Sequence, residues 1–193
     1  MTAVAKLIEL PTRSQDVSQH AVSDRPVGDA LRLAMRELAS GVCIVTTGAA
    51  KSRCGLTATS VTSLSLTPPS VLVCVDKGSR SLAEIVANGA FAVNTLSGSH
   101  RRIAEDFASR GARQGLARFD GADWTQGKFG VPVLTSALAA LECHVGNVVD
   151  WHSHLVVFGL VQHVHLGGQG SALTYWRGDY CQPKVPDPDG TPA

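Results

Sequence analysis

Hydrophobic residues along the chain gather in short runs separated by polar, glycine-containing or proline-containing segments. Most of these runs are rich in β-branched residues or alternate with polar ones, which is typical of strands. Six segments carry such a strand pattern: residues 42–47, 56–66, 71–76, 90–96, 138–149 and 154–166. The last two are too long and too β-branched for helices. The pattern therefore predicts a mainly β protein.

Three segments have helical spacing instead. The first follows Asp29, which can cap a helix. The second begins with Ser81 and Glu84, which match an S-x-x-E capping box, and ends at Gly89. The third covers about residues 98–109, and its inner apolar stripe consists of Ile103, Ala104 and Phe107.

Several antiparallel strands with a few inserted helices predict a β-barrel decorated by helices, and not an alternating βαβ fold. The 193 residues, 44% of them hydrophobic, suit one domain over residues 28–182, between polar tails at 1–27 and 183–193. Residues 110–131 are glycine-rich and charged without periodicity. Such a long loop predicts a functional segment, either a lid or an interface arm.

Charge and cysteine content indicate which binding partners and which cellular compartment to expect. The net charge is +1 and basic residues are dispersed, so neither a nucleic-acid nor an anionic-membrane partner is expected. Five scattered cysteines without a CxxC motif predict neither a disulfide framework nor a thiolate zinc site. No signal-peptide pattern and no apolar window of about 20 residues is present, so we expect a cytoplasmic protein.

The stretch RCGLTATSVTSLSLTPPSVLVCVD, residues 53–76, is unusually rich in Ser and Thr. If residues 56–66 form one strand, neither of its faces is a clean core face. One interpretation is an exposed strand with β-branched polar residues. The other is a bed of small side chains and hydroxyls that lets a flat or phosphorylated ligand approach the backbone. Pro68 and Pro69 mark a turn after it.

The segment DKGSRSLAE follows directly and favours the second interpretation. Ser79, Arg80 and Ser81 lie at a predicted helix start, where free N–H groups and the dipole attract an anion. Arg80 can grip a phosphate with two hydrogen bonds. An ordinary capped helix start is the alternative.

Four histidines near the end of the chain raise the question of a metal site. On one strand, His154 and His163 would be roughly 30 Å apart and on opposite faces, so a shared metal is not expected. His154 opens a long strand and is the better candidate for a ligand-facing position. No nucleophile motif, P-loop or G-x-G-x-x-G sequence is present, which favours chemistry carried by a cofactor.

Taken in order, seven segments resemble the short-chain flavin reductase family, the reductase components of two-component flavin monooxygenases. They are ASGVCIVTT, GLTATSVTSLSLTPPSVLVCVDKGSRS, FAVNTLS, AEDFA, PVLTSALAALECHV, HLVVFGLV and LTYWRGDY, and they extend over about residues 30–181. The sequence departs from the family at His152 and Ser153, where Gly-Asp is frequent, and at Arg80 and Ser81, where Ser and Thr are frequent.

The resemblance implies a Greek-key split β-barrel that binds FMN, forms a homodimer and transfers hydride from NADH or NADPH to FMN or FAD. It implies cofactor-binding positions at Thr57, Ala58, Thr59, Ser60, Cys74, Val75, Asp76, Ser79, Arg80, Ser81, Asn94, Phe107 and Tyr175. It places one catalytic residue, His154, beside the nicotinamide. No metal is expected.

Three readings of the activity remain open at this point. The first is a reductase that supplies reduced flavin to a partner monooxygenase. In the second, the protein retains its flavin and passes electrons to another acceptor, such as the cobalt of a corrinoid in cobalamin biosynthesis. The third is a non-catalytic flavin-binding module. Pyridoxamine-phosphate oxidase chemistry on a related barrel is a weaker option.

Overall fold

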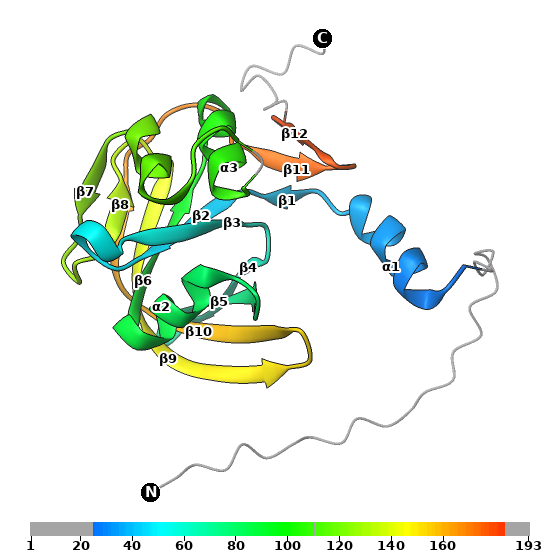
Figure 1. Ribbon diagram of the computed structural model, residues 1–193, viewed down its shortest axis with the longest axis horizontal. Helices are drawn as coiled ribbons and strands as arrows, with labels where there is room; N and C mark the ends of the chain where they lie inside the picture. Colours follow the sequence, from blue (N-terminus) through cyan, green and yellow to red (C-terminus); the bar gives the residue numbers. More distant parts are fainter. Residues whose placement is uncertain (1–24, 110, 184–193) are drawn as a thin grey trace, which may run out of the picture.

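The computed structural model describes residues 25–109 and 111–183, and antiparallel strands make up most of it (Figure 1). Seven strands form the main sheet in the order β3-β2-β6-β9-β10-β5-β4. Their bounds are β2 Cys43–Thr47, β3 Cys54–Ala58, β4 Val61–Leu66, β5 Pro69–Asp76, β6 Ala90–Thr95, β9 Ala139–Trp151 and β10 His154–Leu166. All neighbouring pairs are antiparallel. The predicted mainly β class is confirmed. Most of the two predicted tails lies outside the described residues.

The two edge strands of this sheet are consecutive in the chain. β3 ends at Ala58, β4 begins at Val61, and Thr59 and Ser60 alone connect them. Because such a link spans at most about 10 Å, the sheet must curl until its edges approach at one corner. The two edges are not hydrogen-bonded neighbours, so the barrel stays open between them. This is the Greek-key split barrel that the resemblance implies.

The prediction of one strand over residues 56–66 is wrong. Residues before the Thr59–Ser60 link pair with β2, whereas those after it pair with β5. The chain changes partners at the link, which resets the alternation of faces. The predicted turn at Pro68 and Pro69 is confirmed, since it joins β4 to β5.

Two hydrophobic cores lie on opposite sides of β2. Ile44 faces a core shared with α3, and Val45 faces the barrel interior together with residues of α2 and β5. A strand covered on both faces has no polar side, which explains why all five residues of β2 are buried. The helical elements around these cores are η1 Ala50–Ser52, α2 Arg80–Asn88, η2 Gly98–His100, α3 Arg101–Phe107 and η3 Gly115–Gly121.

The helix boundaries correct three predictions. α1, Val27–Arg36, begins after Pro26, so Asp29 lies in its first turn and is not its cap. α2 begins at Arg80 after Ser79, and the Ser81 capping box does not form, because the helix starts before Ser81. The third predicted helix divides into η2 and α3, although its apolar stripe is buried as expected. Gly89 ends α2 with a φ of 66°, which confirms the predicted stop.

The segment expected to act as a lid or an interface arm is described over residues 111–131, and these residues are folded onto the body. They contain η3 and β7 Trp124–Gln126, which pairs with β8 Pro132–Leu134. Phe119 and Trp124 contact Phe107 with ring centroids 5.0 and 5.6 Å away. These aromatic contacts attach the segment to α3.

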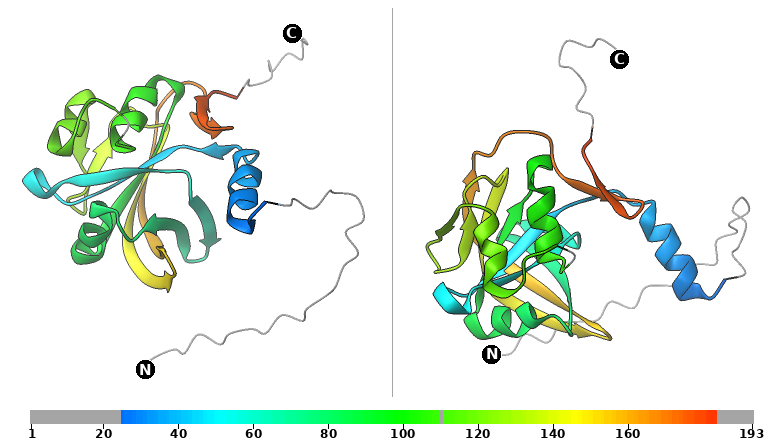
Figure 2. Two further views of the ribbon diagram at one scale, coloured as in Figure 1. Left: turned by 45° about the vertical axis from the view of Figure 1, so that its right-hand side comes forward. Right: turned by 45° about the horizontal axis from the view of Figure 1, so that its top comes forward.

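A three-stranded sheet of β1 Ser40–Gly41, β11 Thr174–Trp176 and β12 Asp179–Cys181 lies beside the barrel. α1 extends away from it and from the barrel (Figures 1 and 2). None of the α1 residues is buried. Within the described residues, every helix is too short or too polar to cross a membrane.

Candidate functional site

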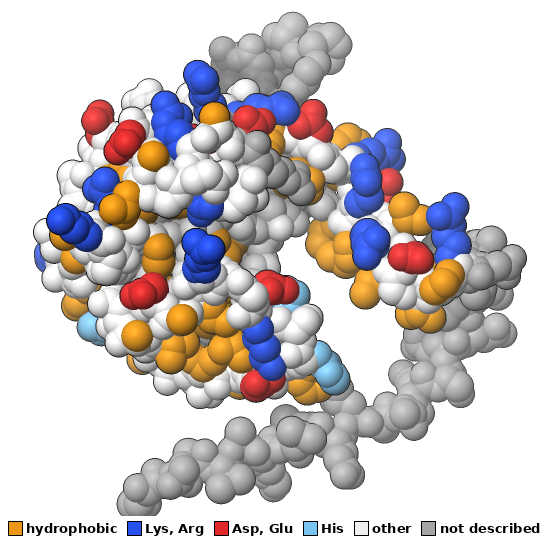
Figure 3. Space-filling view, viewed as in Figure 1, with side chains coloured by type: hydrophobic (Ala, Val, Ile, Leu, Met, Phe, Trp, Pro, Cys, Tyr) orange, Lys and Arg blue, Asp and Glu red, His pale blue; other side chains and the backbone are white. Residues whose placement is uncertain are grey.

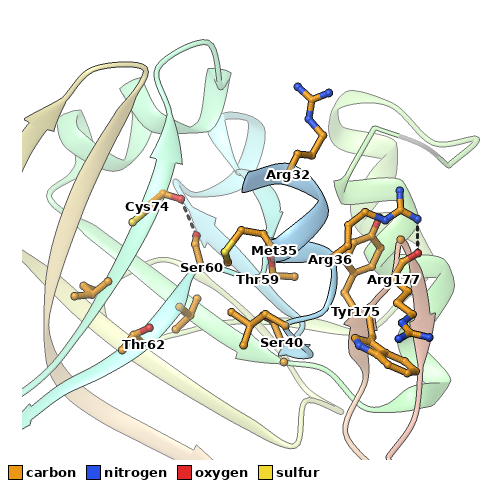
Figure 4. Close-up of a pocket in the computed structure, with 16 residues that line it drawn as sticks. Arg32, Met35, Arg36, Ser40, Thr59, Ser60, Thr62, Cys74, Tyr175 and Arg177 are labelled. Carbon is orange, nitrogen blue, oxygen red and sulfur yellow. Dashed lines mark hydrogen bonds between the residues drawn. The ribbon is translucent and has the colours of Figure 1, made fainter. Parts of the chain in front are cut away.

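A cavity of about 630 Å³ lies beside the Thr59–Ser60 link, and we call it the link cavity (Figure 4). Its walls come from α1, the start of β4, the middle of β5 and the β11 turn. It is lined by Arg32, Met35, Arg36, Leu38, Ser40, Gly41, Thr59, Ser60, Val61, Thr62, Leu72, Cys74, Tyr175, Trp176, Arg177 and Gly178. Such a mixture of small, apolar and aromatic side chains can hold a flat ring.

The link itself is fixed to β5. Ser60 Oγ donates a hydrogen bond of 2.8 Å to the carbonyl oxygen of Cys74, as Figure 4 shows. Across the cavity, Tyr175 is half-buried, and its ring lies 5.2 Å from that of Tyr180. Trp176 Nε1 donates to the Glu37 carbonyl oxygen at 3.2 Å. The β11 wall is therefore held by aromatic and backbone contacts.

A second cavity, of about 530 Å³, lies at the N-terminus of α2, and we call it the helix-start cavity. It is lined by Gly55, Leu56, Thr57, Gly78, Ser79, Arg80, Ser81, Phe107, Ala108, Ser109, Gln114 and Arg118. Thr57 Oγ1 donates to the Ala104 carbonyl oxygen at 2.6 Å, which ties β3 to α3. The first turn of α2 leaves backbone N–H groups without helical partners.

Two arginines give the helix-start cavity its charge. Arg118 Nη2 donates to Ser109 Oγ at 2.9 Å and to Gln114 Oε1 at 3.2 Å. Among the described residues, no carboxylate lies within ion-pair distance of Arg118 or Arg80. Two uncompensated positive charges beside the positive end of a helix fit a phosphate group. The chemistry of the site therefore suits a phosphorylated cofactor.

The structure brings most of the sequence-predicted residues to these two cavities. Thr59, Ser60, Cys74 and Tyr175 line the link cavity. The helix-start cavity is lined by Thr57, Ser79, Arg80, Ser81 and Phe107. The hydroxyl-rich stretch thus contributes to both cavities, through Thr57 in one and through Thr59 and Ser60 in the other.

Three other predicted positions lie inside the fold. Ala58 and Val75 belong to the barrel core. Asn94 is fully buried, its Nδ2 donates to the Ile44 carbonyl oxygen at 3.0 Å, and its Oδ1 accepts from Leu134 N at 2.8 Å. These side chains line neither cavity, and Asn94 joins three elements of the fold.

Asp76 and His154 lie opposite each other at the ends of β5 and β10. Both are exposed, and neither lines the link cavity or the helix-start cavity. Asp76 Oδ1 accepts a hydrogen bond from Gly78 N at 2.7 Å, which shapes the turn into α2. His154 Nδ1 lies 2.9 Å from Ser153 Oγ.

The other histidines have separate contacts. His165 Nε2 lies 2.7 Å from Oε1 of the buried Glu142, and the ring of His163 lies 5.8 Å from that of Phe129. In the part of the chain that the structure describes, no group of three or more His, Cys, Asp or Glu residues is placed to hold a metal ion.

Sequence reasoning missed Arg118, together with the contributions of α1 and the β11 turn to the link cavity. Arg118 comes from the aperiodic segment 110–131, where no motif connects it to residues 79–81. α1 shows an amphipathic pattern, but periodicity does not indicate what a helix faces. Both contributions depend on contacts between distant parts of the chain.

A split barrel with one cavity of mixed apolar, aromatic and polar lining and a second cavity at a basic helix start suits a phosphorylated, ring-containing cofactor. The sequence profile of the flavin reductase like domain matches residues 35–184. The chain belongs to this family.

Two curated relatives and one solved structure illustrate the similarity. FMN reductase (NADH) RutF of Methylorubrum populi is 36% identical over 165 residues, which cover 85% of this chain and 81% of the relative. The 4-hydroxyphenylacetate 3-monooxygenase reductase component of Pseudomonas aeruginosa is 33% identical over 161 residues, with 83% and 95% covered. The structure of Streptomyces globisporus NADH:FAD oxidoreductase SgcE6 in complex with NAD and FAD fragments has a TM-score of 0.77 at 30% identity, covering 88% of this chain and 100% of that one.

Proposed function

We propose that this chain is a flavin reductase that transfers hydride from NADH to a bound flavin. The observation that carries the proposal is the helix-start cavity, where Arg80 and Arg118 lie at the N-terminus of α2. Among the described residues, neither arginine forms an ion pair with a carboxylate. The link cavity is bordered by Thr59 and Ser60, which follow β3 in the chain, and offers room for a ring. Family membership and relatives named as NADH-dependent flavin reductases support the same conclusion.

The residues of the two cavities have distinct tasks in this activity. Arg80, Arg118 and the α2 N–H groups bind the flavin phosphate through charge-assisted hydrogen bonds. The bond from Ser60 to Cys74 keeps the link close to β5, so that small side chains border the ring. Bound flavin supplies the hydride-accepting chemistry. The protein then has to orient two rings, which requires no general acid or base.

We assign His154 to the nicotinamide side of the site, and the support comes from strand register. His154 is opposite Asp76 in the β10–β5 pair, and directly opposed residues share a face. Cys74, two residues before Asp76, is on that same face and lines the link cavity. His154 therefore lies on the cavity face, about 7 Å farther along the strands than Cys74.

The His154→Ala variant tests this assignment. We expect a higher KM for NADH and an unchanged Kd for flavin, because the side chain lies beyond the flavin-binding part of the cavity. Steady-state kinetics and flavin fluorescence titration measure the two quantities. A weaker flavin Kd with an unchanged KM for NADH would place His154 in the flavin pocket instead.

We infer that the physiological acceptor is a flavin-dependent monooxygenase that receives reduced flavin. A relative is named as the reductase component of such a system. The link cavity has α1, a helix without buried residues, as one wall, which suits a flavin that enters and leaves. We place this exchange in the cytoplasm, since a reducing compartment suits the five free cysteines.

We also infer a homodimer, because α1 exposes an apolar surface that its own chain leaves uncovered. Val27, Leu31, Leu33, Met35 and Leu38 are all exposed. Figure 3 shows hydrophobic side chains of α1 bordering the hollow between this helix and the barrel. Exposed apolar surface of this kind marks an interaction site, and a second copy of the chain is the occupant that the family resemblance implies.

Light scattering of the wild type and of Leu31→Glu tests the homodimer. We expect a dimer for the wild type and a monomer for the variant, since a charge would be buried at the interface. Arg32→Gln, on the same helix, is the control for the same change of net charge without a new buried charge. A monomeric wild type would contradict the inference.

Anaerobic titration with NADH tests the main proposal. With FMN or FAD added, we expect the absorbance of oxidised flavin to disappear in proportion to the NADH supplied. A bound flavin that NADH and NADPH leave oxidised would favour a non-catalytic flavin-binding module. A tightly retained flavin that reduces a separate acceptor, such as a cobalt corrinoid, without added flavin would favour the second reading.

The Arg80→Ala variant tests the phosphate contact. We expect its flavin binding to weaken by about 1 to 3 kcal/mol, because a charged hydrogen bond is lost. Fluorescence titration with FMN and with riboflavin, which lacks the phosphate, measures the effect. Riboflavin should bind equally to wild type and variant. An unchanged Kd for FMN would remove Arg80 from the site.

A further inference from the structure

A third cavity, of about 390 Å³, continues from the helix-start cavity, and we call it the distal cavity. The two share the side chains and backbone of Gly55, Arg80, Ser81, Gln114 and Arg118. The residues of the distal cavity alone are Lys51, Ser52, Arg53, Cys54, Glu84, Gly115, Leu116 and Phe119. The shared residues make the two cavities direct neighbours.

The three cavities follow one another along the chain around β3. The link cavity contacts Thr59 and Ser60, the helix-start cavity residues 55–57, and the distal cavity residues 51–55. Extended backbone advances about 3.3 Å per residue, so Arg53 and Ser60 lie roughly 20 Å apart. A ligand with its ring in the link cavity and its phosphate in the helix-start cavity would direct any group beyond that phosphate into the distal cavity.

The distal cavity carries an excess of positive charge. Lys51, Arg53, Arg80 and Arg118 line it, against Glu84 as its one acidic residue. In the described ranges, none of the four basic side chains is within ion-pair distance of a carboxylate. Such a cluster attracts a further anionic group.

The Arg53 side chain is held in place by its surroundings. Its guanidinium lies over the ring of Phe119, 4.7 Å from the centroid. Its Nε is buried and has no hydrogen-bond partner in the described structure. Because the side chain is already ordered by stacking, binding an anion costs it less conformational entropy than it would cost a free surface arginine.

We propose that the distal cavity binds the part of FAD that FMN lacks, its second phosphate and adenosine, and that this chain therefore prefers FAD to FMN. The inference rests on the proposed function, since it requires a flavin phosphate in the helix-start cavity. The basic residues contact the second phosphate. Leu116, 42% exposed at the same cavity, offers an apolar surface to the adenine.

The same AMP group also occurs in NADH, and the order of the cavities favours the flavin as its source. The nicotinamide must reach the flavin ring in the link cavity, at the other end of the row. The AMP part of FAD is bonded to the FMN phosphate, which the proposed function places in the helix-start cavity, next to the distal one. The shared chemistry is thus an adenosine with its phosphate, and the experiment separates the two sources.

Dissociation constants of FMN and FAD for the wild type and for Lys51→Gln/Arg53→Gln test the proposal. We expect the wild type to bind FAD about tenfold more tightly than FMN. The double variant should lose about tenfold in affinity for FAD and remain within about twofold for FMN. Lys128→Gln removes one positive charge at an exposed position outside the three cavities, as Lys51→Gln does inside the distal cavity, and should alter neither affinity.

Lys51→Gln alone provides a second measurement if loss of the Arg53 stacking disturbs the fold. Lys51 is exposed, and its replacement should weaken FAD binding about threefold without affecting FMN. Equal affinities for FMN and FAD in the wild type, or equal losses in the variants, would overturn the inference. Reduction of both flavins by NADH in that case would leave the proposed function standing.

Kinetics with FMN as the flavin identify the source of the AMP group. An unchanged KM for NADH in the double variant supports FAD as the ligand of the distal cavity. A raised KM for NADH would assign the cavity to the dinucleotide and overturn the proposal. Failure of both flavins to bind the wild type would overturn this inference and the proposed function together.

Discussion

The helix-start cavity and the link cavity differ in how their walls are supported. The helix-start cavity is bordered by Phe107, which is 2% exposed, and by Thr57, whose hydroxyl is bonded to α3. One wall of the link cavity is α1, in which no residue is buried. The phosphate end of the proposed flavin site is therefore part of the folded core, whereas the ring end is closed by an element outside it.

This contrast suits a protein that binds a flavin and releases it. A preorganised phosphate site provides affinity without a large cost of ordering. A ring site bordered by an unpacked helix allows exchange, because moving α1 disturbs no buried contact of its own chain. The difference between a rigid phosphate site and a less constrained ring site is a physical reason why the same barrel can bind a flavin and release it again.

The largest expected effect separates the two regions by stability. Phe107→Ala should lower the free energy of unfolding by about 3 to 5 kcal/mol. The substitution removes a buried ring and leaves an empty space in the core that borders the helix-start cavity. Leu31→Ala on α1 should change it by no more than about 0.5 kcal/mol in the monomer. Urea unfolding at concentrations where the chain is monomeric measures both. A loss in Leu31→Ala as large as that in Phe107→Ala would mean that α1 packs on its own barrel.

A second test concerns affinity at the helix-start cavity. Arg118→Ala should weaken FMN binding about tenfold, or about 1.4 kcal/mol, because one charged contact to the phosphate is lost. Arg102→Ala is the matched control, since Arg102 is exposed on α3 and lines none of the three cavities. Equal FMN affinity in the Arg118 variant and the wild type would show that Arg118 does not contact the phosphate, which would leave it only its hydrogen bonds to Ser109 and Gln114.

A smaller effect is expected at the link. Ser60→Ala removes the hydrogen bond to the Cys74 carbonyl oxygen, and it should lower the free energy of unfolding by about 1 kcal/mol. The affinity for FMN should fall less than in Arg118→Ala, because Ser60 offers the flavin no charged group. Urea unfolding and fluorescence titration of the same variant measure the two changes. A greater loss of affinity at Ser60 than at Arg118 would reverse the proposed division between the regions.

The smallest expected effect is a pH dependence of the packed region through His100. Its Nδ1 accepts a hydrogen bond from Ser97 N at 3.1 Å, and its Nε2 lies 2.9 Å from Ser136 Oγ. Burial lowers the pKa of His100 below its ordinary value of 6.5. The unfolded chain therefore binds a proton at a higher pH than the folded chain, and stability falls as the pH decreases below about 6.5.

Unfolding of the wild type and of His100→Gln over roughly pH 5 to 8 measures this contribution. We expect a shallower decrease in stability on acidification for the variant, because glutamine does not titrate. FMN affinity should stay constant, since His100 lines neither cavity of the proposed flavin site. Identical pH dependence in both proteins would show that His100 has the same pKa in the folded and unfolded chains.

Several elements of the site could be predicted from sequence because their information is local. Ser79, Arg80 and Ser81 are adjacent in the chain, and the helix that begins there has a clear pattern and a terminal glycine. The strand segments follow from alternation and β-branching, and most of their limits were close to those observed. The continuous strand over residues 56–66 failed, because periodicity contains no signal for a change of pairing partner within one polar, β-rich run.

The sequence by itself determined the strand-rich class, the family, the helix start that attracts an anion and the hydroxyl-rich stretch beside it. Only the tertiary structure decided that Arg118 joins Arg80, that Asn94 serves the fold, and that α1 walls one cavity. The physical reason is the distance along the chain over which each signal acts. Periodicity and capping act over a few residues, whereas the curl of the sheet brings its edges together at Thr59 and Ser60 and gathers the cavities around them.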